Sequence, residues 1–400
     1  MKKILVMPDG NWLSHTSRPF EIAKVLRKLG YLVVFASDGQ YMKLPRESGF
    51  EVLPIFTISP QRVLKCSRAG LANWYDYNLI KQCVEAELEL FTREKPDLVL
   101  TDFRLSVSIS CEIGEIPMVM VLNAAWTNYY SVPVRAPEHL KIARIVGSRI
   151  ANLLAPIGKR WIQKSGNKGF NKYRREHGLP LRGNIYDTWR GKLNLMVDIP
   201  EYSPTTNLPS DFHYIGPIVW EPDIELPTWL NDLDPNKPTI YFTMGSTGYA
   251  RFFDQAIEIF GDSKYQCIMT TAGMAQISAI PSNFYVVDYA PGSEIMKRSD
   301  VVVCQGGNGT IYQAMSYGVP IIGIPTMHDQ EYNLDRVEAL GIGIQLSELK
   351  FKPSHLADAV EIILNNEEYR DNARYYMNIL SEYNAPQKGA ELIADFLYSM

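Results

Sequence analysis

The sequence predicts an α/β protein with two Rossmann-like domains, each built on a doubly wound parallel sheet. Three observations support this prediction. Strand patterns alternate with helix-length segments in the first half of the chain, the alternation restarts in the second half, and a proline- and acid-rich stretch separates the halves. Parallel strands need helix-length connections, which place helices on both faces of a sheet. A chain of 400 residues is long enough for two or three domains with separate cores.

The first predicted strand, Ile4–Met7, stops at Pro8-Asp9-Gly10, so its apolar run is too short for a signal peptide. A helix pattern follows over Pro19–Leu29, with the proline at the first turn and Gly30 where the helix stops. Further strands are expected at Tyr31–Ala36, Leu98–Thr101 and Met118–Leu122. We assign residues 1–215 to this first domain.

The stretch from Gly216 to Pro238 is rich in proline and acidic residues and has no helical period. Such a composition is typical of a connector, so residues 216–238 are predicted to link two domains. The second domain, 239–380, is expected to contain strands at Thr239–Thr243, Gln266–Thr270, Phe284–Val287, Val301–Cys304 and Ile321–Ile324. The final segment, 381–400, ends in a run with a helical pattern from Ala390 to Met400.

The composition excludes several classes of function. Forty basic and 44 acidic residues give a net charge of −4, so the chain has no general attraction for nucleic acid. No apolar run approaches the roughly 18 residues that indicate a membrane span. The cysteines are scattered, odd in number and without metal-ligand spacing, which favours reduced thiols in a cytoplasmic protein. They are Cys66, Cys83, Cys111, Cys267 and Cys304.

A glycine-rich turn, Gln305-Gly306-Gly307-Asn308-Gly309, lies between a β-branched strand and an amphipathic stretch. Glycines let the backbone approach a ligand closely, and the N-terminal end of the next helix favours an anion, most often phosphate. A lone turn of this kind is weak evidence, because most such turns only join a strand to a helix. Gly318-Val319-Pro320 and the run from Pro325 to Gln330 follow it and add weight.

Together these motifs resemble the signature of the UDP-glycosyltransferase family, His-Gly-Gly-x-Gly-Thr-x-x-Glu, then Gly-Val-Pro, then Pro-x-x-x-Asp-Gln with an Asn shortly after. The chain is similar to the bacterial natural-product enzymes of macrolide type in that family, over almost its whole length. Residues at the family spacing are Gly306, Gly307, Gly309, Thr310, Gly318, Val319, Pro320, Pro325, Asp329, Gln330 and Asn333. The resemblance implies a GT-B fold, with two domains facing across a cleft and a C-terminal helix in 381–400 that crosses back to the first domain.

The resemblance also implies a nucleotide-sugar co-substrate and no other cofactor or metal. Donor-binding positions carried over from the family are Gly245, Ser246, Thr247, Tyr289, Ala290, Gln305, Gly307, Asn308, Gly309, Thr310, Gln313, Asp329 and Gln330. Two of them depart from the pattern, since Gln305 replaces the family histidine and Gln313 replaces the family glutamate. An amide contributes only neutral hydrogen bonds to a diphosphate, and Gln313 offers one acceptor oxygen to the ribose. A UDP-sugar is the first expectation, and a dTDP-sugar is a second.

His15 is the candidate base, because a hydroxyl becomes a good nucleophile only when its proton leaves and histidine titrates near neutral pH. It follows the first strand, at the carboxyl edge where doubly wound sheets bind ligands. By resemblance this is the catalytic histidine position, and Asp102 is the carboxylate that orients it. The local sequence departs from the family, with Ser14 and Arg18 in place of a glycine and a proline. Alternative roles are a capping or surface histidine and an aspartate that caps the next helix.

Aromatic side chains are the candidates for an acceptor pocket, which this family forms in the first domain. They would suit a flat or apolar aglycone, and they would equally suit an ordinary core. The candidates are Trp12, Trp74, Tyr75, Tyr77, Trp126, Tyr129 and Tyr130.

Residues 141–175 contain ten Lys or Arg and no acidic residue, interleaved with aliphatic side chains and Trp161. A basic amphipathic segment can lie on an anionic membrane, as in glycosyltransferases that act on lipids. The alternative is a solvated helix face packed on the first domain, which Pro156 and Gly158 favour by interrupting the stripe.

These observations predict an inverting, metal-independent glycosyltransferase that acts on a small-molecule acceptor, in the cytoplasm or at the membrane periphery, as a monomer or homodimer. Two rivals remain open at this point. One is a non-catalytic nucleotide-sugar-binding protein, suggested by Gln305 and Gln313, and the other is an enzyme that forms glycolipids. Retention of both His15 and Asp102 argues against the non-catalytic protein.

Overall fold

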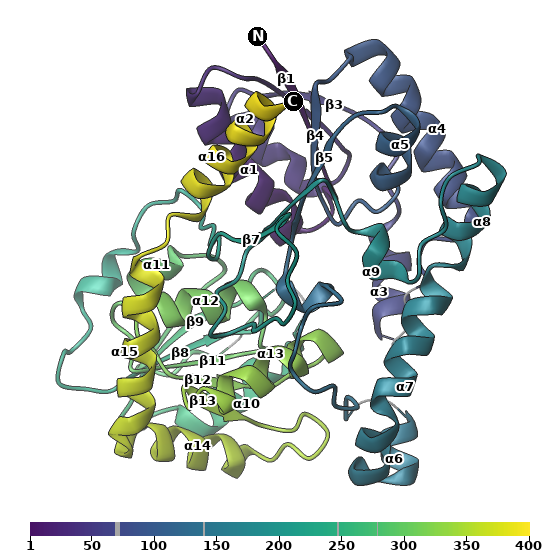
Figure 1. Cartoon of the computed structure of the whole chain (residues 1–400). Helices are drawn as coiled ribbons and strands as arrows, with labels where there is room; N and C mark the ends of the chain where they lie inside the picture. The colour runs from purple at the N-terminus through teal and green to yellow at the C-terminus, as the bar shows by residue number, and fades with distance from the viewer. Residues whose placement is uncertain (69–72, 139–140, 246–247, 278) are drawn as a thin grey trace. The chain divides into compact units, whose positions relative to one another are not determined.

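The computed structural model describes the chain except for residues 69–72, 139–140, 246–247 and 278. Two compact units are present, each with its own sheet (Figure 1). Unit 1 comprises Met1–Ala136, Val146–Trp220 and Tyr383–Met400, and unit 2 comprises Pro137–Ile145 and Glu221–Glu382. Residues 221–238 of the predicted connector thus group with unit 2, and so do residues 137–145.

Unit 1 is built on a seven-stranded, wholly parallel sheet with the order β3-β2-β1-β4-β5-β6-β7. The strands are β1 (Lys3–Pro8), β2 (Leu32–Ala36), β3 (Glu51–Leu53), β4 (Leu98–Asp102), β5 (Met118–Leu122), β6 (Leu193–Met196) and β7 (Phe212–Tyr214). Four of them were predicted, whereas the short strands β3, β6 and β7 were not. The helices are α1 (Leu13–Lys28), α2 (Lys43–Glu47), α3 (Pro60–Arg68), α4 (Tyr77–Glu94), α5 (Val107–Ile113), α7 (Ser148–Gly166), α8 (Lys168–Glu176), α9 (Ile185–Thr188) and α16 (Ala385–Ser399).

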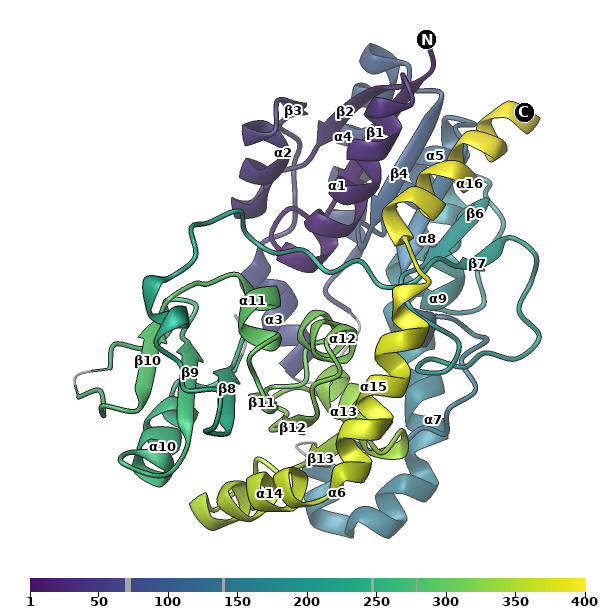
Figure 2. The ribbon, with the colours of Figure 1, turned by 90° about the vertical axis from the view of Figure 1, so that its left-hand side faces the viewer.

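Alternate side chains of β1 divide the core of unit 1 into two layers. Leu5 and Met7 pack with residues of α4, α5 and α8, whereas Ile4 and Val6 pack with α1 and α16 on the other face. The C-terminal helix α16 runs along α1 (Figure 2). A Cβ at Gly389 of α16 would lie 3.1 Å from Ile22 of α1, so the absence of a side chain permits the close approach.

The first helix differs from the prediction. It begins at Leu13 rather than Pro19, so Pro19 lies inside the helix and His15 in its first turn rather than in a loop. Proline already has a helical φ, but at position 19 it lacks the N–H that would donate to the carbonyl of His15, and its ring crowds that carbonyl. The helix stops as expected, since Gly30 follows its end with φ 91°.

Unit 2 is built on a six-stranded parallel sheet with the order β10-β9-β8-β11-β12-β13. The strands are β8 (Thr239–Thr243), β9 (Gln266–Thr270), β10 (Phe284–Val287), β11 (Val301–Cys304), β12 (Ile321–Gly323) and β13 (Gly343–Gln345). The helices are α10 (Arg251–Phe260), α11 (Gly292–Met296), α12 (Asn308–Ser316), α13 (His328–Ala339), α14 (Pro353–Asn365) and α15 (Glu367–Ser381). Ile240 and Phe242 of β8 face α10 and α14 in one apolar layer. The predicted fold class, two doubly wound parallel sheets, is therefore confirmed.

Helix α6 (Lys141–Val146) follows β5 and precedes β6 in the chain, and all but its last residue group with unit 2. Among the helices that the structure describes, none combines the length and the apolar character needed to cross a membrane.

Candidate active site

The carboxyl edge of the first sheet brings His15 and Asp102 together. Nδ1 of His15 lies 2.8 Å from Oδ1 of Asp102, the last residue of β4. The aspartate is buried and the imidazole is partly exposed. Because a carboxylate only accepts hydrogen bonds, we assign the proton to Nδ1 and leave Nε2 as the basic nitrogen. Asp102 does not cap the following helix, whose N-cap residue is Ser106, so the capping alternative is wrong.

Arg18 completes this pair as a buried cation. Its Nε donates to Oδ2 of Asp102 and its Nη2 donates to Oδ1, both at 2.8 Å, in a bidentate pair. The same Nη2 lies 3.0 Å from Nδ1 of His15. Residues three apart on a helix share a face, so α1 presents His15 and Arg18 together to one carboxylate. In the sequence, Arg18 was noted only because it replaces the proline of the family pattern.

The network extends along the ends of the next two strands. Nη1 of Arg18 donates to Oδ1 of Asn123 at 2.7 Å, directly after β5. Asn123 in turn donates to Asp198, which follows β6 and also accepts from the backbone N–H of Ala124 at 2.7 Å. Sequence reasoning missed Asn123 and Asp198. Both residues could have been predicted from their position just after a strand, because doubly wound sheets bind ligands at that edge.

Phe103 forms the apolar wall beside the imidazole. Its ring stacks on His15 with 4.3 Å between centroids and 3° between planes. The residue has φ 60°, a left-handed conformation that is a genuine outlier for a bulky side chain. Its neighbour Arg104 is anchored by a buried ion pair, 2.7 Å from Nε to Oε1 of Glu87. This anchor fixes the loop after β4 and holds the Phe103 ring over His15.

Three tryptophans continue the aromatic cluster that starts at Phe103. Trp74 stacks on Phe103, Trp189 packs against Phe103, and Trp126 meets Trp189 edge-on at 5.1 Å. Within the described residues, the indole N–H groups of Trp74 and Trp189 are buried without a hydrogen-bond partner. Of the predicted acceptor residues, Trp74 and Trp126 therefore join the cluster around His15.

The other aromatic candidates have different surroundings. The hydroxyl of Tyr77 donates to Glu176, and its ring packs against Tyr173. The side chain of Tyr77 therefore belongs to the contact between α4 and α8. Tyr130 pairs with Thr205 in an isolated β-bridge. Tyr75 is buried in the core against Phe170, and the ring of Tyr129 meets Phe212 edge-on. Trp12 is the N-cap residue of α1, and its buried indole N–H has no partner among the described residues.

Asp9, one residue past β1, is a second buried carboxyl group near the imidazole. Burial raises its pKa above the ordinary value of 3.8, against the hydrogen bonds from Asn11 and the charge of His15, which lower it. Asn11 donates to Oδ1 of Asp9 through its backbone N–H at 3.1 Å and its side chain at 3.0 Å. The loop after β1 therefore contains a buried carboxyl group whose pKa lies above its ordinary value.

In unit 2, two turns at the carboxyl ends of β8 and β11 meet through Gln305. Gly245 has φ 53°, and a Cβ there would lie 2.1 Å from Nε2 of Gln305. The buried amide of Gln305 thus fills the space that a glycine leaves open, and its Oε1 has no partner among the described residues. The predicted donor residues Ser246 and Thr247 lie outside the described part of the chain.

The first turn of α12 directly follows the glycine motif, where an anion-binding helix start was predicted. Its first residues, Asn308, Gly309 and Thr310, carry N–H groups with no intrahelical partner, and Gly307 is the N-cap residue with extended backbone. Nothing lies within 4 Å of a Cβ placed on Gly309, so the end of the helix is open there. Asn333 fixes the turn by donating to the carbonyl of Gly306 at 3.0 Å.

The remaining donor-site candidates lie on α12, on α13 and after β10. Gln313 lies against Gly292, where a Cβ would approach its amide to 2.5 Å. Oε1 of Gln330 accepts from the backbone N–H of Thr326 at 2.8 Å and of Met327 at 3.1 Å, so this oxygen positions the loop before α13. Oδ1 of Asp329 is buried and has no partner among the described residues, which leaves it available to a hydroxyl. In the loop after β10, Tyr289 is exposed and Ala290 is buried.

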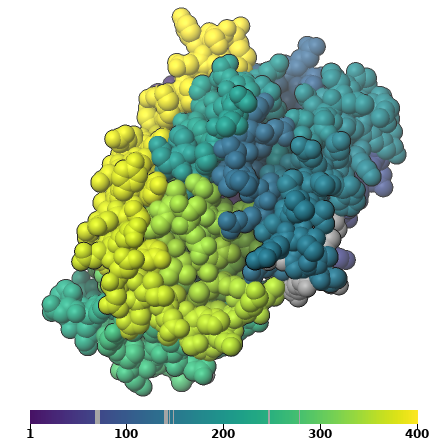
Figure 3. All heavy atoms as spheres, turned by 60° about the horizontal axis from the view of Figure 1, so that its bottom comes forward, coloured from purple at the N-terminus to yellow at the C-terminus, as the bar shows by residue number. Residues whose placement is uncertain are grey.

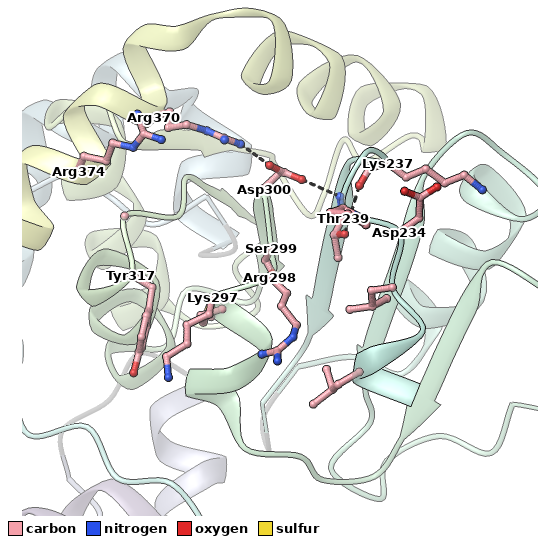
Figure 4. A pocket seen from close by; sticks show the side chains of 15 residues that line it. Asp234, Lys237, Thr239, Lys297, Arg298, Ser299, Asp300, Tyr317, Arg370 and Arg374 are labelled. Atoms are coloured by element: carbon pink, nitrogen blue, oxygen red, sulfur yellow. Dashed lines mark hydrogen bonds and ion pairs between the residues drawn. The ribbon is translucent and has the colours of Figure 1, made fainter. Parts of the chain in front are cut away.

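A pocket of about 520 Å³ in unit 2 is separate from these turns (Figure 4). It lies at the amino ends of β8 and β11, whereas Gly245 and Gln305 follow the carboxyl ends. Asp300 at its edge accepts from the N–H of Thr239 at 2.8 Å and pairs with Arg370 at 2.6 Å. These contacts join α15 to the base of the sheet, and we assign this pocket no part in the chemistry. Among the described residues, no group of three His, Cys, Asp or Glu side chains could hold a metal ion.

Comparisons with known proteins add to this geometry. Residues 258–395 match the family model for the "Erythromycin biosynthesis protein CIII-like, C-terminal domain". The PGL/p-HBAD biosynthesis glycosyltransferase of Mycobacterium tuberculosis is 33% identical over 378 residues, which cover 93% of this chain and 87% of that protein. The PGL/p-HBAD biosynthesis rhamnosyltransferase of Mycobacterium bovis is 33% identical over 374 residues, covering 93% and 83%. The crystal structure of the glycosyltransferase VinC in complex with dTDP has a TM-score of 0.72 at 19% identity, with both chains fully covered, and so shares the fold.

Proposed function

Because the chain belongs to the family 1-type, GT-B superfamily of glycosyltransferases, we propose that it moves a sugar from a nucleoside diphosphate to a hydroxyl of a small acceptor. The proposed transfer inverts the anomeric centre and needs no metal ion. The observation that carries the proposal is the 2.8 Å contact between His15 and the buried Asp102.

In the proposed step, Nε2 of His15 removes the proton from the acceptor hydroxyl. The acceptor oxygen attacks the anomeric carbon, the bond from that carbon to the diphosphate oxygen breaks, and its electron pair leaves with the nucleoside diphosphate. Asp102 stabilises the imidazolium that forms and keeps the proton on Nδ1 throughout. Arg18 holds the carboxylate by two bonds, so that Asp102 cannot rotate away from the imidazole.

The leaving diphosphate would be bound by unit 2. The N–H groups and positive dipole end of α12 are suited to its charge, and the buried amide of Gln305 supplies neutral hydrogen bonds. Donors that are fixed before the reaction stabilise developing charge at little reorganisation cost. This arrangement supports a leaving group stabilised without a cation from the protein at position 305.

Of the two expected donors, we favour a dTDP-activated 6-deoxyhexose over a UDP-hexose. One relative is named a rhamnosyltransferase, and the fold neighbour VinC was solved with dTDP. Gln313 provides one acceptor oxygen where the family glutamate provides two, which suits a sugar ring of the nucleoside with fewer hydroxyls. The stacked aromatic side chains around His15, above all the buried Trp74 and the half-buried Trp126, support an apolar or aromatic acceptor.

The first test is binding and turnover with purified protein. We expect dTDP and its sugar conjugates to raise the melting temperature more than UDP, GDP or their conjugates. In a transfer assay with the stabilising donor and phenolic or aliphatic alcohols, His15→Ala should abolish turnover and leave donor binding intact. A variant that binds the donor as before and still turns over normally would remove His15 as the base. Stabilisation by no nucleotide sugar would contradict the proposed function, whereas donor binding without turnover by the wild-type protein would favour the non-catalytic alternative.

A further inference from the structure

Helix α7 carries an apolar stripe on its outer surface. Ile150, Leu153, Leu154, Ile157 and Trp161 recur at the three- and four-residue spacing that places side chains on one face of a helix. Their exposed fractions are 53%, 78%, 42%, 67% and 63%, and Ile145 in the preceding α6 is 82% exposed. A helix that stabilises its own domain turns such a stripe inward, so this stripe has another purpose.

The inner face of α7 is made mostly of small and polar residues, with Ile162 half-buried among them. Ala151 and Gly166 are buried, and the Nζ of Lys159 lies 5.7 Å above the ring of Tyr186 in α9. Helices α8 and α9 are its neighbours in unit 1. The helix is therefore attached to unit 1 through its less apolar side, with its more apolar stripe turned outward. In the space-filling view of Figure 3, the blue-green part of the chain that includes α7 lies at the surface.

The charges beside the stripe are all positive. Arg149, Arg160 and Lys164 of α7 are exposed, and among the described residues no carboxylate forms an ion pair with any of them. Residues 141–175 contain ten Lys or Arg and no acidic residue, in a chain whose net charge is −4. The local charge is thus opposite to that of the whole chain, and it complements an anionic surface.

We propose that α7 docks this protein on the surface of an anionic lipid bilayer. A helix with one aliphatic and aromatic face, flanked by Lys and Arg, lies in the plane of the interface with its apolar side among the acyl chains. Trp161 suits the level of the headgroups, and the long stems of Arg160 and Lys164 can reach anionic headgroups beside the buried stripe. At 19 residues, with these cations, α7 lies on a membrane rather than across it.

A second copy of the chain is the competing occupant of the stripe. Pairing two α7 helices would bury the apolar residues, but it would also bring two positively charged flanks together without a carboxylate from the same segment. A bilayer containing anionic lipid satisfies the apolar and the charged side chains together. The proposal is independent of the sugar, the acceptor and the role of His15.

The test uses the full chain and sedimentation with vesicles of phosphatidylcholine, with and without phosphatidylglycerol. We expect binding to the anionic vesicles only, weakened by high salt. The double variant L153Q/I157Q should bind at least about tenfold more weakly, because it removes the two aliphatic side chains at the centre of the stripe. Ile362→Gln, on the exposed side of α14, is the matched control and should bind like wild type.

Removing charge should act separately from removing apolar area. R160Q/K164Q should lower the affinity for anionic vesicles on the order of thirtyfold and flatten the salt dependence. All four substituted side chains are exposed, so melting temperatures should stay within a few degrees of wild type. As a second readout, a polarity-sensitive dye on Ile157→Cys should shift to the blue only with anionic vesicles.

Three results would overturn the proposal: no binding to anionic vesicles, equal binding by L153Q/I157Q and wild type, or a dye at position 157 that stays in water. Sedimentation velocity decides the competing occupant. A wild-type dimer that L153Q/I157Q converts to a monomer, without vesicle binding, would assign the stripe to self-association. Transfer to a water-soluble acceptor should be the same in L153Q/I157Q and wild type, so failure of this proposal would leave the proposed enzymatic function standing.

Discussion

The imidazole of His15 lies parallel to the ring of Phe103, with 4.3 Å between the ring centroids. Phe103 directly follows Asp102, so one short segment after β4 supplies both the carboxylate on Nδ1 and the wall against the flat face of the imidazole. The left-handed backbone of Phe103, with φ 60°, directs its ring there. A strained conformation next to a buried polar pair is more typical of a working site than of a stabilising core.

We predict that Phe103→Leu lowers kcat by about tenfold to a hundredfold and changes KM for the donor little. Leucine fills part of the volume but gives the imidazole no ring to stack on, so His15 gains rotational freedom. Phe103→Tyr keeps the ring and is the matched control. Steady-state kinetics with donor and acceptor varied in turn separate kcat from KM. Unchanged kcat in Phe103→Leu would mean that Asp102 alone orients the base.

Arg18 is predicted to be a positioning residue that acts through Asp102. Arg18→Met leaves a buried carboxylate without its cation, which should lower the free energy of unfolding by about 3–5 kcal/mol. Arg18→Lys restores a charge but not the bidentate geometry, so stability should recover more than kcat does. Urea unfolding and kinetics on the same preparations test this. If kcat and stability recovered in parallel in the lysine variant, Arg18 would have a structural role only.

How much of this site the sequence predicts depends on where each residue lies relative to a strand end. The strand patterns placed His15 and Asp102 correctly at one edge of the first sheet, because each comes at or after the end of a buried strand rich in aliphatic residues. The start of α1 was misplaced, since Pro19 resembles a first-turn proline and the true first turn, from Leu13, has no side-chain cap. With Leu13 as the start, Arg18 would have shared a helix face with His15.

Other features depend on tertiary contacts that no local pattern carries. The positive φ of Phe103 is held by the loop after β4, and a phenylalanine gives no signal for it. The strands β3 and β7 contain three residues each, too few for a period to be detected. The outward stripe of α7 was visible in the sequence as amphipathic, but the direction it faces follows from which side packs on α8 and α9.

The buried ion pair of Glu87 and Arg104 should be a major source of stability for the loop after β4. Glu87 also accepts hydrogen bonds from Ser106 at 2.6 Å and Ser110 at 2.5 Å, so Glu87→Gln removes the charge and misplaces a donor. We expect a loss of about 3–5 kcal/mol in the free energy of unfolding. Glu85→Gln on the same helix removes an exposed pair with Lys81 and should cost no more than about 0.5 kcal/mol. Similar effects of the two substitutions in urea unfolding would contradict this assignment.

Gly245 is predicted to strengthen donor binding. Gly245→Ala meets Gln305 and strains a left-handed backbone, which should cost about 1–2 kcal/mol and displace the turn from the diphosphate. We expect at least about tenfold weaker nucleotide binding by calorimetry. Gly158→Ala, where a Cβ meets nothing within 4 Å, is the control and should bind the nucleotide like wild type. Wild-type affinity in Gly245→Ala would show that this turn does not touch the donor.

Asp9 should make the protein less stable as the pH rises. Burial raises the pKa of its carboxyl group in the folded state above 3.8, so the folded protein holds this proton more tightly than the unfolded chain does. The resulting stabilisation is fully present below the unfolded value and is lost as the pH rises through the higher folded value. Asp9→Asn removes the ionisation and keeps an oxygen for the hydrogen bonds from Asn11.

The difference in unfolding free energy between Asp9→Asn and wild type should therefore shift in favour of the variant as the pH rises from about 4 to about 8. Urea unfolding at intervals across this range measures it. Asp371→Asn, at an exposed position of α15, provides the baseline, because substitution there removes a carboxylate that water already solvates. A difference that stays flat with pH, or that moves in favour of wild type, would mean that Asp9 is stabilised as a carboxylate and that the hydrogen bonds from Asn11 outweigh its burial.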